Sequence, residues 1–256
     1  MKKIILSLLA GVCLVACTPK GPLAEYKELT DSVLAQMERA TSRDVVDSLI
    51  ENYIEVSYTL LMANVVKQET DSIIMDMYYL LTPEQKAELF AVVPAERWET
   101  EGMQDIYNNY QAELRTAPGQ LYTDVVALKQ DSTPLHLSEV VGTADYVLVD
   151  FWASWCGPCK AEIPNLVELQ NKFGGDKFMV LGVNVWDEEA AFKAALEEEG
   201  ITYPQIVVPQ NNKDNATELY GIQGIPQIIL FGPDGTIVKR DLRGQAMKDL
   251  VEEKMK

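Results

Sequence analysis

Histidine, which most zinc and hydrolytic sites need, is nearly absent from this sequence. His136 is the only histidine in the 256 residues, so zinc sites and Cys-His or Ser-His-Asp catalysis lack material. No phosphate-binding glycine loop is visible either. We therefore predict no metal site, and we expect His136 to be a surface or sheet residue.

Basic residues are also scarce. The chain has 22 Lys and Arg residues against 39 Asp and Glu residues, which gives a net charge of −17. An acidic surface of this kind argues against binding to nucleic acid and against electrostatic adhesion to anionic lipid. We find no internal repeat, and after the N-terminal segment no hydrophobic stretch approaches a membrane span.

The N-terminus has the pattern of a secretory signal. Lys2 and Lys3 precede an apolar run, Ile4–Ala16, which is shorter than the roughly 20 residues of a membrane-spanning helix. The run ends in Leu14–Cys17 and resembles the bacterial lipoprotein signal, which implies cleavage before Cys17 and lipid attachment to that cysteine. An ordinary signal peptide or an uncleaved anchor is the alternative. We assign residues 1–16 to the signal and 17–24 to a tether.

Cysteine is too rare for a framework of structural disulfides. Of the four cysteines, Cys13 lies in the signal and Cys17 is the expected lipid site, which leaves Cys156 and Cys159. A secreted domain stapled by disulfides would need more. The remaining pair is therefore expected to be catalytic.

Residues 25–116 are predicted to form a small all-α domain. Apolar residues recur at three- and four-residue spacing, and Thr82–Glu84 has the N-cap, the proline and the acidic residue of a helix start. A last helix is expected to begin at Pro94–Glu96 and to run through Leu114. Ala117–Gly119 breaks the pattern and marks a domain boundary.

Residues 117–256 alternate strands with helices, which predicts an α/β domain with a parallel core. A late hairpin around Gly232–Gly235 adds an antiparallel edge. The expected strands are Tyr122–Leu128, a segment near Leu135, Tyr146–Phe151, Phe178–Val185, Gln205–Val208, Gln227–Phe231 and Thr236–Asp241. The expected helices are Lys160–Phe173, Asp187–Glu199, Ala216–Tyr220 and residues 246–256.

The C-x-x-C pair follows a strand and opens a helix. A bare C-x-x-C is ambiguous between redox chemistry and zinc binding. If the helix begins within the motif, unpaired N–H groups and the helix dipole stabilise a thiolate at Cys156. We predict Cys156 as the nucleophile and Cys159 as the shielded resolving thiol. Pro158 fits the first turn, and Trp155 is expected to cover one side of the pair.

Two segments resemble the signatures of thioredoxin: Asp150–Lys160, with Gly157 and Pro158 between the cysteines, and Tyr220–Pro226. The resemblance implies a thioredoxin-like fold, a central mixed sheet flanked by helices. It also implies that Pro226 is cis beside the sulfurs and that Ile225 presents its backbone to a substrate peptide. An ordinary turn proline is the alternative for Pro226.

The same resemblance gives roles to two further residues. Asp150 matches a buried acid behind the resolving cysteine, where a raised pKa lets it take the proton from Cys159. A strand-end aspartate that faces solvent is the alternative. Gly244 resembles the glycine that lines the substrate groove. Gln227 stands where thioredoxin usually has threonine, and thioredoxin's lysine partner to the buried acid cannot be placed here.

The pattern C-x-x-C-x-x-E-x-P ends at Pro164 and resembles the TlpA/ResA-type family of membrane-anchored, extracytoplasmic thioredoxin-like proteins. The resemblance covers residues 117–256, including an extra helix and strand within 178–208. It implies that Glu162 lies near the site and tunes the thiol pKa values. A solvated helix glutamate is the alternative. Many members carry an acidic residue between the cysteines, whereas this chain has Gly157 and Pro158.

We therefore predict a lipid-anchored thiol–disulfide oxidoreductase that faces the periplasm and acts on protein thiols and disulfides. Its only redox group would be a Cys156–Cys159 disulfide, with no dissociable cofactor. The thioredoxin-like C-G-P-C favours a reductant, re-reduced by a membrane electron donor of the DsbD/CcdA type. Two alternatives remain: a thiol peroxidase-like antioxidant protein, although the P-x-x-x-T-x-x-C motif is missing, and a thioredoxin-fold binding or chaperone module.

Overall fold

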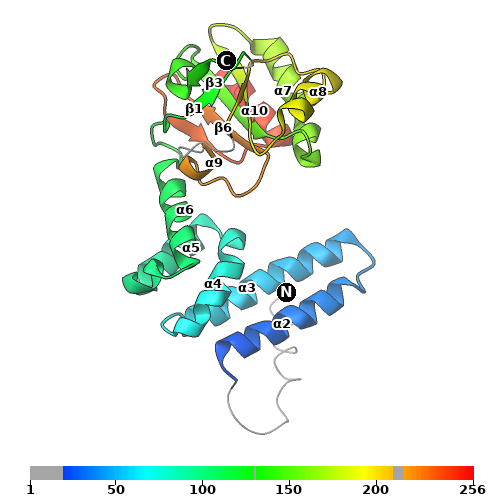
Figure 1. The fold of residues 1–256 in the computed structure, drawn as a ribbon. Helices are drawn as coiled ribbons and strands as arrows, with labels where there is room; N and C mark the ends of the chain where they lie inside the picture. Colours follow the sequence, from blue (N-terminus) through cyan, green and yellow to red (C-terminus); the bar gives the residue numbers. More distant parts are fainter. Residues whose placement is uncertain (1–19, 130, 210–215) are drawn as a thin grey trace. The chain divides into compact units, whose positions relative to one another are not determined.

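The structure is a computed structural model that describes residues 20–129, 131–209 and 216–256. Cys13, Cys17 and the predicted signal peptide lie outside the described residues. The chain divides into two compact units, a helical unit that ends at Ile106 and a sheet unit, Tyr107–Lys256 (Figure 1). The division falls inside a helix, whereas the sequence predicts the boundary at the end of that helix, after residue 116.

The first unit is all helical. Its longest helices lie side by side (Figure 1), and the Tyr53 hydroxyl donates a hydrogen bond of 2.7 Å to the Tyr26 hydroxyl between them. As predicted, Thr82 caps a helix that starts at Pro83. The Gln85 side chain completes a capping box, which the sequence analysis did not predict. The helices are α2 (Pro22–Met37), α3 (Arg43–Asn64), α4 (Asp71–Met77) and α5 (Pro83–Val92), with 3₁₀ turns η2 (Gln68–Thr70), η3 (Tyr78–Leu80) and η4 (Ala95–Glu99).

The predicted last helix is wrong at its start. Residues from Ala95 form only the short η4 turn, and the helix α6 (Met103–Arg115) begins after Gly102. The backbone of Gly102 has a φ of +82°, which a right-handed helix cannot contain and which glycine adopts readily. The extended backbone of Thr100 and the positive φ of Gly102 together divide one expected helix into two elements.

The second unit is built on a seven-stranded sheet with the order β2-β1-β5-β4-β3-β6-β7. The interior strand β3 pairs parallel with β4 and antiparallel with β6, and β6 pairs with β7 in the predicted hairpin. The strands are β1 (Val126–Leu128), β2 (Pro134–His136), β3 (Tyr146–Trp152), β4 (Phe178–Asn184), β5 (Gln205–Val207), β6 (Gln227–Phe231) and β7 (Ile237–Lys239). The helices are α7 (Gly157–Phe173), α8 (Glu189–Glu198), α9 (Ala216–Leu219) and α10 (Gly244–Lys254), with η5 (Leu137–Glu139).

Successive side chains of β3 point alternately to the two faces of the sheet, so every second one faces α7 and α10. Val147, Val149 and Phe151 belong to a core that includes Tyr220 near α9. Leu148 packs instead with residues of α7 and α10. Because successive side chains of a strand point to opposite faces, Asp150 lies on the same face as Leu148, beneath the helix that carries the cysteines.

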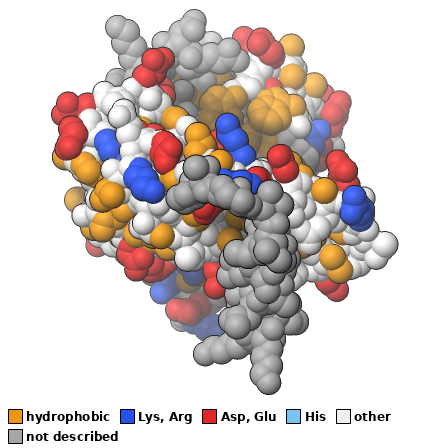
Figure 2. All heavy atoms as spheres, turned by 90° about the horizontal axis from the view of Figure 1, so that it is seen from below, with side chains coloured by type: hydrophobic (Ala, Val, Ile, Leu, Met, Phe, Trp, Pro, Cys, Tyr) orange, Lys and Arg blue, Asp and Glu red, His pale blue; other side chains and the backbone are white. Residues whose placement is uncertain are grey.

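The surface is acidic. Acidic side chains are spread over the face seen in Figure 2 and do not gather in one patch. Within the ranges that the structure describes, no helix is long and apolar enough to cross a membrane. No cluster of three or more potential metal-ligating side chains occurs there either. His136 ends β2, and its Nδ1 lies 2.9 Å from Asp124 Oδ2, so it is the surface sheet residue that the sequence predicts.

Candidate active site

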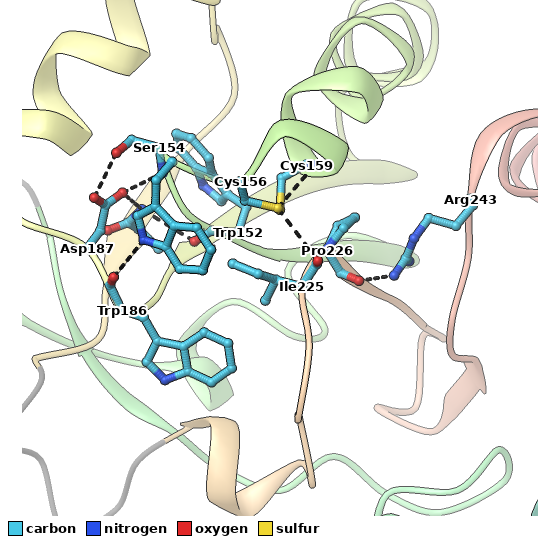
Figure 3. Close-up of a disulfide and its surroundings, with 11 residues drawn as sticks. Trp152, Ser154, Cys156, Cys159, Trp186, Asp187, Ile225, Pro226 and Arg243 are labelled. Carbon is cyan, nitrogen blue, oxygen red and sulfur yellow. Dashed lines mark hydrogen bonds between the residues drawn. A yellow bond between two sulfur atoms is a disulfide. The ribbon is translucent and has the colours of Figure 1, made fainter. Parts of the chain in front are cut away.

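Cys156 and Cys159 form a disulfide at the N-terminus of α7 (Figure 3). Cys156 is the N-cap residue, and its Sγ accepts the Cys159 N–H at 3.2 Å. Pro158 occupies the first turn, where its missing N–H costs nothing. Cys156 is 5% exposed and Cys159 is fully buried. Cys156 therefore lies at the helix start and Cys159 one turn inside it, which is the placement that the sequence predicts.

The Ile225–Pro226 peptide bond is cis and faces the disulfide (Figure 3). The Ile225 carbonyl oxygen lies 3.6 Å from Cys156 Sγ. Gln227 follows as the first residue of β6, and its side chain is buried. The structure thus brings together the two segments whose resemblance to thioredoxin the sequence reveals, although they lie far apart in the chain.

Asp150 is completely buried at the middle of the sheet. Neither carboxyl oxygen has a hydrogen-bond partner among the described residues. Burial raises the pKa of Asp150 to about 8; the positive charge of Arg243 opposes that rise, and the negative charge of Glu162 adds to it. A buried carboxyl with this pKa can hold or accept a proton near neutral pH. The alternative of a solvent-facing aspartate is wrong.

Glu162 lies one turn along α7 from Cys159 and reaches the start of α10. Its carboxylate oxygens accept the Gly244 N–H at 3.0 and 3.1 Å, and one of them accepts Asn165 Nδ2 at 3.0 Å. An acidic group at a helix N-terminus satisfies an unpaired N–H and interacts well with the helix dipole. Glu162 is therefore not a solvated surface residue, and the Gly244 amide is engaged with it.

Arg243 is a site residue that the sequence analysis missed. Its guanidinium donates hydrogen bonds to the carbonyl of cis-Pro226 and to the Leu242 carbonyl, and its charge acts on Asp150 and Glu162. Figure 3 shows the side chain extending toward the proline loop. Arg243 therefore supplies the positive charge near the buried acid for which no lysine could be placed.

Tyr203 is a second residue near the site that no sequence pattern predicts. Its side chain is buried, and its hydroxyl has no hydrogen-bond partner among the described residues. Burial raises the pKa of the Tyr203 phenol, and the nearby Asp150 raises it further. The buried acid therefore lies close to a neutral hydroxyl as well as to Arg243.

The loop after β4 holds the other side of the site. The Asp187 carboxylate accepts the Ser154 N–H at 2.6 Å, Ser154 Oγ at 2.8 Å, Asn184 Nδ2 at 2.9 Å and the Glu188 N–H at 3.0 Å. These bonds tie the loop to the segment just before Cys156 (Figure 3). The cysteine motif is thus braced from β4 as well as from β3.

Trp155, which the sequence analysis expects to cover one side of the cysteine pair, lies largely in solvent. Its side chain is 62% exposed, and its Nε1 donates a hydrogen bond of 2.9 Å to the Trp186 carbonyl. The side chain is fixed at this end, while most of its surface faces solvent. The buried tryptophan of the motif is instead Trp152, whose Nε1 donates to Gln205 Oε1 at 2.9 Å.

The sheet order, the disulfide at a helix start and the adjacent cis-proline together define a thioredoxin-like protein. Comparison with known proteins gives the same class: residues 118–240 match the AhpC/TSA family. The chain belongs to the TlpA/ResA-type family of thioredoxin-like proteins.

Two curated relatives and one solved structure illustrate the match. The chain is 32% identical to the thiol:disulfide interchange protein HelX of Rhodobacter capsulatus over 42% of this chain and 57% of HelX. It is 26% identical to the thiol-disulfide oxidoreductase ResA of Halalkalibacterium halodurans over 58% of this chain and 82% of ResA. The chain thus spans little more than half the length of HelX.

The solved structure is the thioredoxin domain of a thiol-disulfide oxidoreductase from Bacteroides vulgatus. It is 31% identical to this chain, with a TM-score of 0.51, and the match covers 55% of this chain and 99% of that domain. The likeness supports the fold of the sheet unit.

Proposed function

We propose that this protein is an extracytoplasmic, membrane-anchored thiol–disulfide oxidoreductase that reduces protein disulfides through Cys156 and Cys159. One observation carries the proposal: the carbonyl oxygen next to a cis-proline lies 3.6 Å from the sulfur at the helix start. An extended substrate segment that pairs with the backbone of Ile225 would bring its own sulfur to Cys156.

The reaction starts from the dithiol form. The Cys156 thiolate, stabilised at the N-terminus of α7, attacks one sulfur of a substrate disulfide. A bond forms between that sulfur and Cys156 Sγ, and the substrate disulfide breaks. The other substrate cysteine leaves as a thiolate. The product is a mixed disulfide between the protein and its substrate.

The second step releases the reduced substrate. Asp150, in its ionised form, takes the proton from the Cys159 thiol, and the resulting thiolate attacks Cys156 Sγ. The Cys156–Cys159 disulfide forms, and the second substrate cysteine leaves as a thiolate. In total the substrate disulfide gains two electrons, and the protein dithiol loses two.

The disulfide must then be reduced again for another cycle. We assign this step to a membrane electron donor of the DsbD/CcdA type, which would pass two electrons to the Cys156–Cys159 pair by the same exchange chemistry. No dissociable cofactor takes part in this proposal. The surface that binds the substrate polypeptide would be formed by Trp155, Gly157, Pro158, Ile225 and Pro226. Glu162 on α7, held by the Gly244 N–H at the start of α10, would act on Asp150 through its negative charge.

The location follows from the N-terminal pattern. Lipid on Cys17 would anchor the chain to a membrane with both units on the extracytoplasmic side. Metabolic labelling with a radioactive fatty acid tests this point. Label should enter the wild type and be lost in Cys17→Ser, and equal labelling of both chains would remove the anchor from the proposal.

Reduction of insulin disulfides by the dithiol form tests the activity. The wild type should precipitate the insulin B chain, and Cys156→Ser should be inactive. Cys159→Ser should stop at the mixed disulfide and accumulate a covalent complex, whose partners in cell extract identify the clients. Equal activity of the wild type and Cys156→Ser would overturn the proposal.

A further inference from the structure

Two tryptophans beside the disulfide expose their side chains. Trp155 is 62% exposed and Trp186 is 37% exposed, whereas Trp152 in the same region is buried. Indole rings are among the largest apolar side chains, so leaving two of them in water forgoes a substantial gain in burial. Two exposed indoles near a reactive site, one of them hydrogen-bonded to the backbone carbonyl of the other residue, therefore need an explanation.

The backbone of Trp186 adds a second observation. Its φ is +54°, in the left-handed region that glycine, asparagine and aspartate tolerate and bulky residues avoid. The surrounding structure maintains this conformation. The Trp186 carbonyl accepts Trp155 Nε1 at 2.9 Å, and the next residue, Asp187, binds Ser154, Asn184 and the Glu188 amide. The chain thus fixes a disfavoured conformation at a residue that a smaller side chain would suit better.

The indole of Trp186 lies on the side of the site where a substrate would bind. Figure 3 shows its indole projecting away from Asp187, on the side where Ile225 lies. A substrate sulfur has to reach Cys156 Sγ, which is 3.6 Å from the Ile225 carbonyl. A substrate chain that continues from the reacting cysteine would therefore pass beside this carbonyl, and Figure 3 places Trp186 in the same region.

We propose that Trp186, held by Trp155, binds an apolar or aromatic side chain of the substrate polypeptide next to its disulfide. This inference rests on the proposed function, since it needs a protein disulfide at Cys156. The occupant is an extended polypeptide segment, because only a chain continuing from the reacting cysteine reaches both Ile225 and Trp186. The two indoles thereby favour disulfides in exposed apolar segments over small disulfides and over disulfides flanked by charged residues.

The test compares three substrates of wild type and variants. Two are synthetic peptides with the same disulfide, one with leucine and tryptophan beside the cysteines and one with aspartate and serine there. The third is hydroxyethyl disulfide. For Trp186→Asn, the ratio of kcat/KM for the apolar peptide to that for hydroxyethyl disulfide should fall about 10-fold or more, since the contact of a large apolar side chain is worth at least that factor. The ratio for the acidic peptide should change much less.

The substitutions are chosen so that misfolding cannot explain a loss. Asparagine and glycine both suit a φ of +54° better than tryptophan does, so Trp186→Asn and Trp186→Gly should be at least as stable as the wild type. The matched control is Leu121→Ala, which removes another apolar side chain that is 62% exposed in the same unit. It should leave both ratios unchanged.

Three results would overturn the inference. The first is an unchanged ratio in both Trp186 variants. The second is an equal loss for all three substrates, which would mean that Trp186 only shapes the cysteine motif. The third is a dimer that dissociates in the variants while the ratio stays constant, which would make the indoles an interface between copies of this chain. In each case an inactive Cys156→Ser would leave the proposed function standing.

Discussion

Arg97 in the helical unit and Asp150 in the sheet unit are both buried charged residues, but only Arg97 is surrounded by partners. Arg97 is 7% exposed and pairs with Asp71, and it also donates hydrogen bonds to Thr70 Oγ1 at 3.0 Å and to the Val65 carbonyl. Asp150 has no hydrogen-bond partner among the described residues.

The difference separates a structural charge from a reactive one. A buried ion with its hydrogen bonds complete keeps its charge and joins the segments that it touches. A buried carboxyl without them shifts its pKa toward the neutral form and becomes able to exchange a proton near physiological pH. Removal of Arg97 should therefore damage the fold, and removal of Asp150 should damage the reaction.

Substitution of Asp150 should have the largest effect. Asp150→Asn keeps the shape of the side chain and removes the proton acceptor, so resolution of the mixed disulfide by Cys159 should slow about 10²- to 10⁴-fold. Stopped-flow measurement with a fluorescent peptide disulfide separates this step from the attack by Cys156. An unchanged rate of resolution would show that Asp150 takes no part in it.

Substitution of Arg97 should affect stability instead. Breaking a buried ion pair by removing one partner costs about 3–5 kcal/mol, so Arg97→Met should lower the free energy of unfolding by that order in urea denaturation. Resolution of the mixed disulfide should keep its rate as long as the chain is folded. Arg43→Met is the matched control, because Arg43 pairs with Asp47 at the surface, where such pairs contribute little. Equal losses in the two variants would contradict the comparison.

The pH dependence of stability should carry the signature of Asp150. Between its ordinary value of 3.8 and about 8, the carboxyl is protonated in the folded chain and ionised in the unfolded chain. Folding therefore takes up a proton, and the free energy of unfolding should fall as pH rises through this window. One pKa unit corresponds to about 1.4 kcal/mol, so the fall should amount to several kcal/mol.

In Asp150→Asn, the free energy of unfolding should lack the part of the fall with rising pH that Asp150 causes. Urea denaturation of the oxidised wild type and variant at several pH values between 4 and 9 measures the difference. The variant should gain stability relative to the wild type as pH rises. Parallel curves for the two chains would mean that the carboxyl is already ionised in the folded state.

Substitution of Arg243 should have a smaller effect on the reaction. It should raise the pKa of Asp150, as burial does. The positive charge of Arg243 lowers the pKa of Asp150, so Arg243→Met should move the pH profile of mixed-disulfide resolution upward by about one pH unit. Arg243→Lys keeps the charge and should restore most of the profile. A loss of rate in Arg243→Met without a shift of the profile would assign Arg243 only to the cis-proline loop, whose carbonyl it also binds.

Substitution of Glu162 should have the smallest effect. It should lower the pKa of Asp150, whereas substitution of Arg243 should raise it. The negative charge of Glu162 raises the pKa of Asp150, as a weaker influence than that of Arg243. Glu162→Gln should therefore move the same profile downward by a smaller amount, while the amide oxygen can still accept the Gly244 N–H. Glu168→Gln, further along α7 and paired with Lys248, is the control and should leave the profile in place.

The sequence predicts the part of the site that lies in two short motifs. Three features follow from residues close together in the chain or from the resemblance to thioredoxin. They are the position of Cys156 at a helix start, the cis bond before Pro226 and the burial of Asp150. Arg243 could not be predicted, because it meets Asp150 and Pro226 only when α10 packs against α7. The role of Trp186 could not be predicted, because its backbone conformation is held by contacts from the segment after β3 and from β4.

The fold shows the same limit. The strands and the late hairpin could be predicted because alternation and turn residues are local signals. The long helix expected from Pro94 was wrong because the apolar spacing continues across Thr100 and Gly102, where the backbone is extended and then has a positive φ. Local patterns therefore predict the elements well, and they predict contacts between elements poorly.

The central claim is that burial raises the pKa of Asp150 to about 8, so that its ionised form is a base strong enough to take the proton of Cys159. Infrared difference spectroscopy of the wild type against Asp150→Asn measures its protonation state directly through the carboxyl C=O stretch. We predict a protonated-carboxyl band at pH 6 that disappears as pH rises through about 8. Absence of that band at pH 6 would show an ionised Asp150 and would contradict the account.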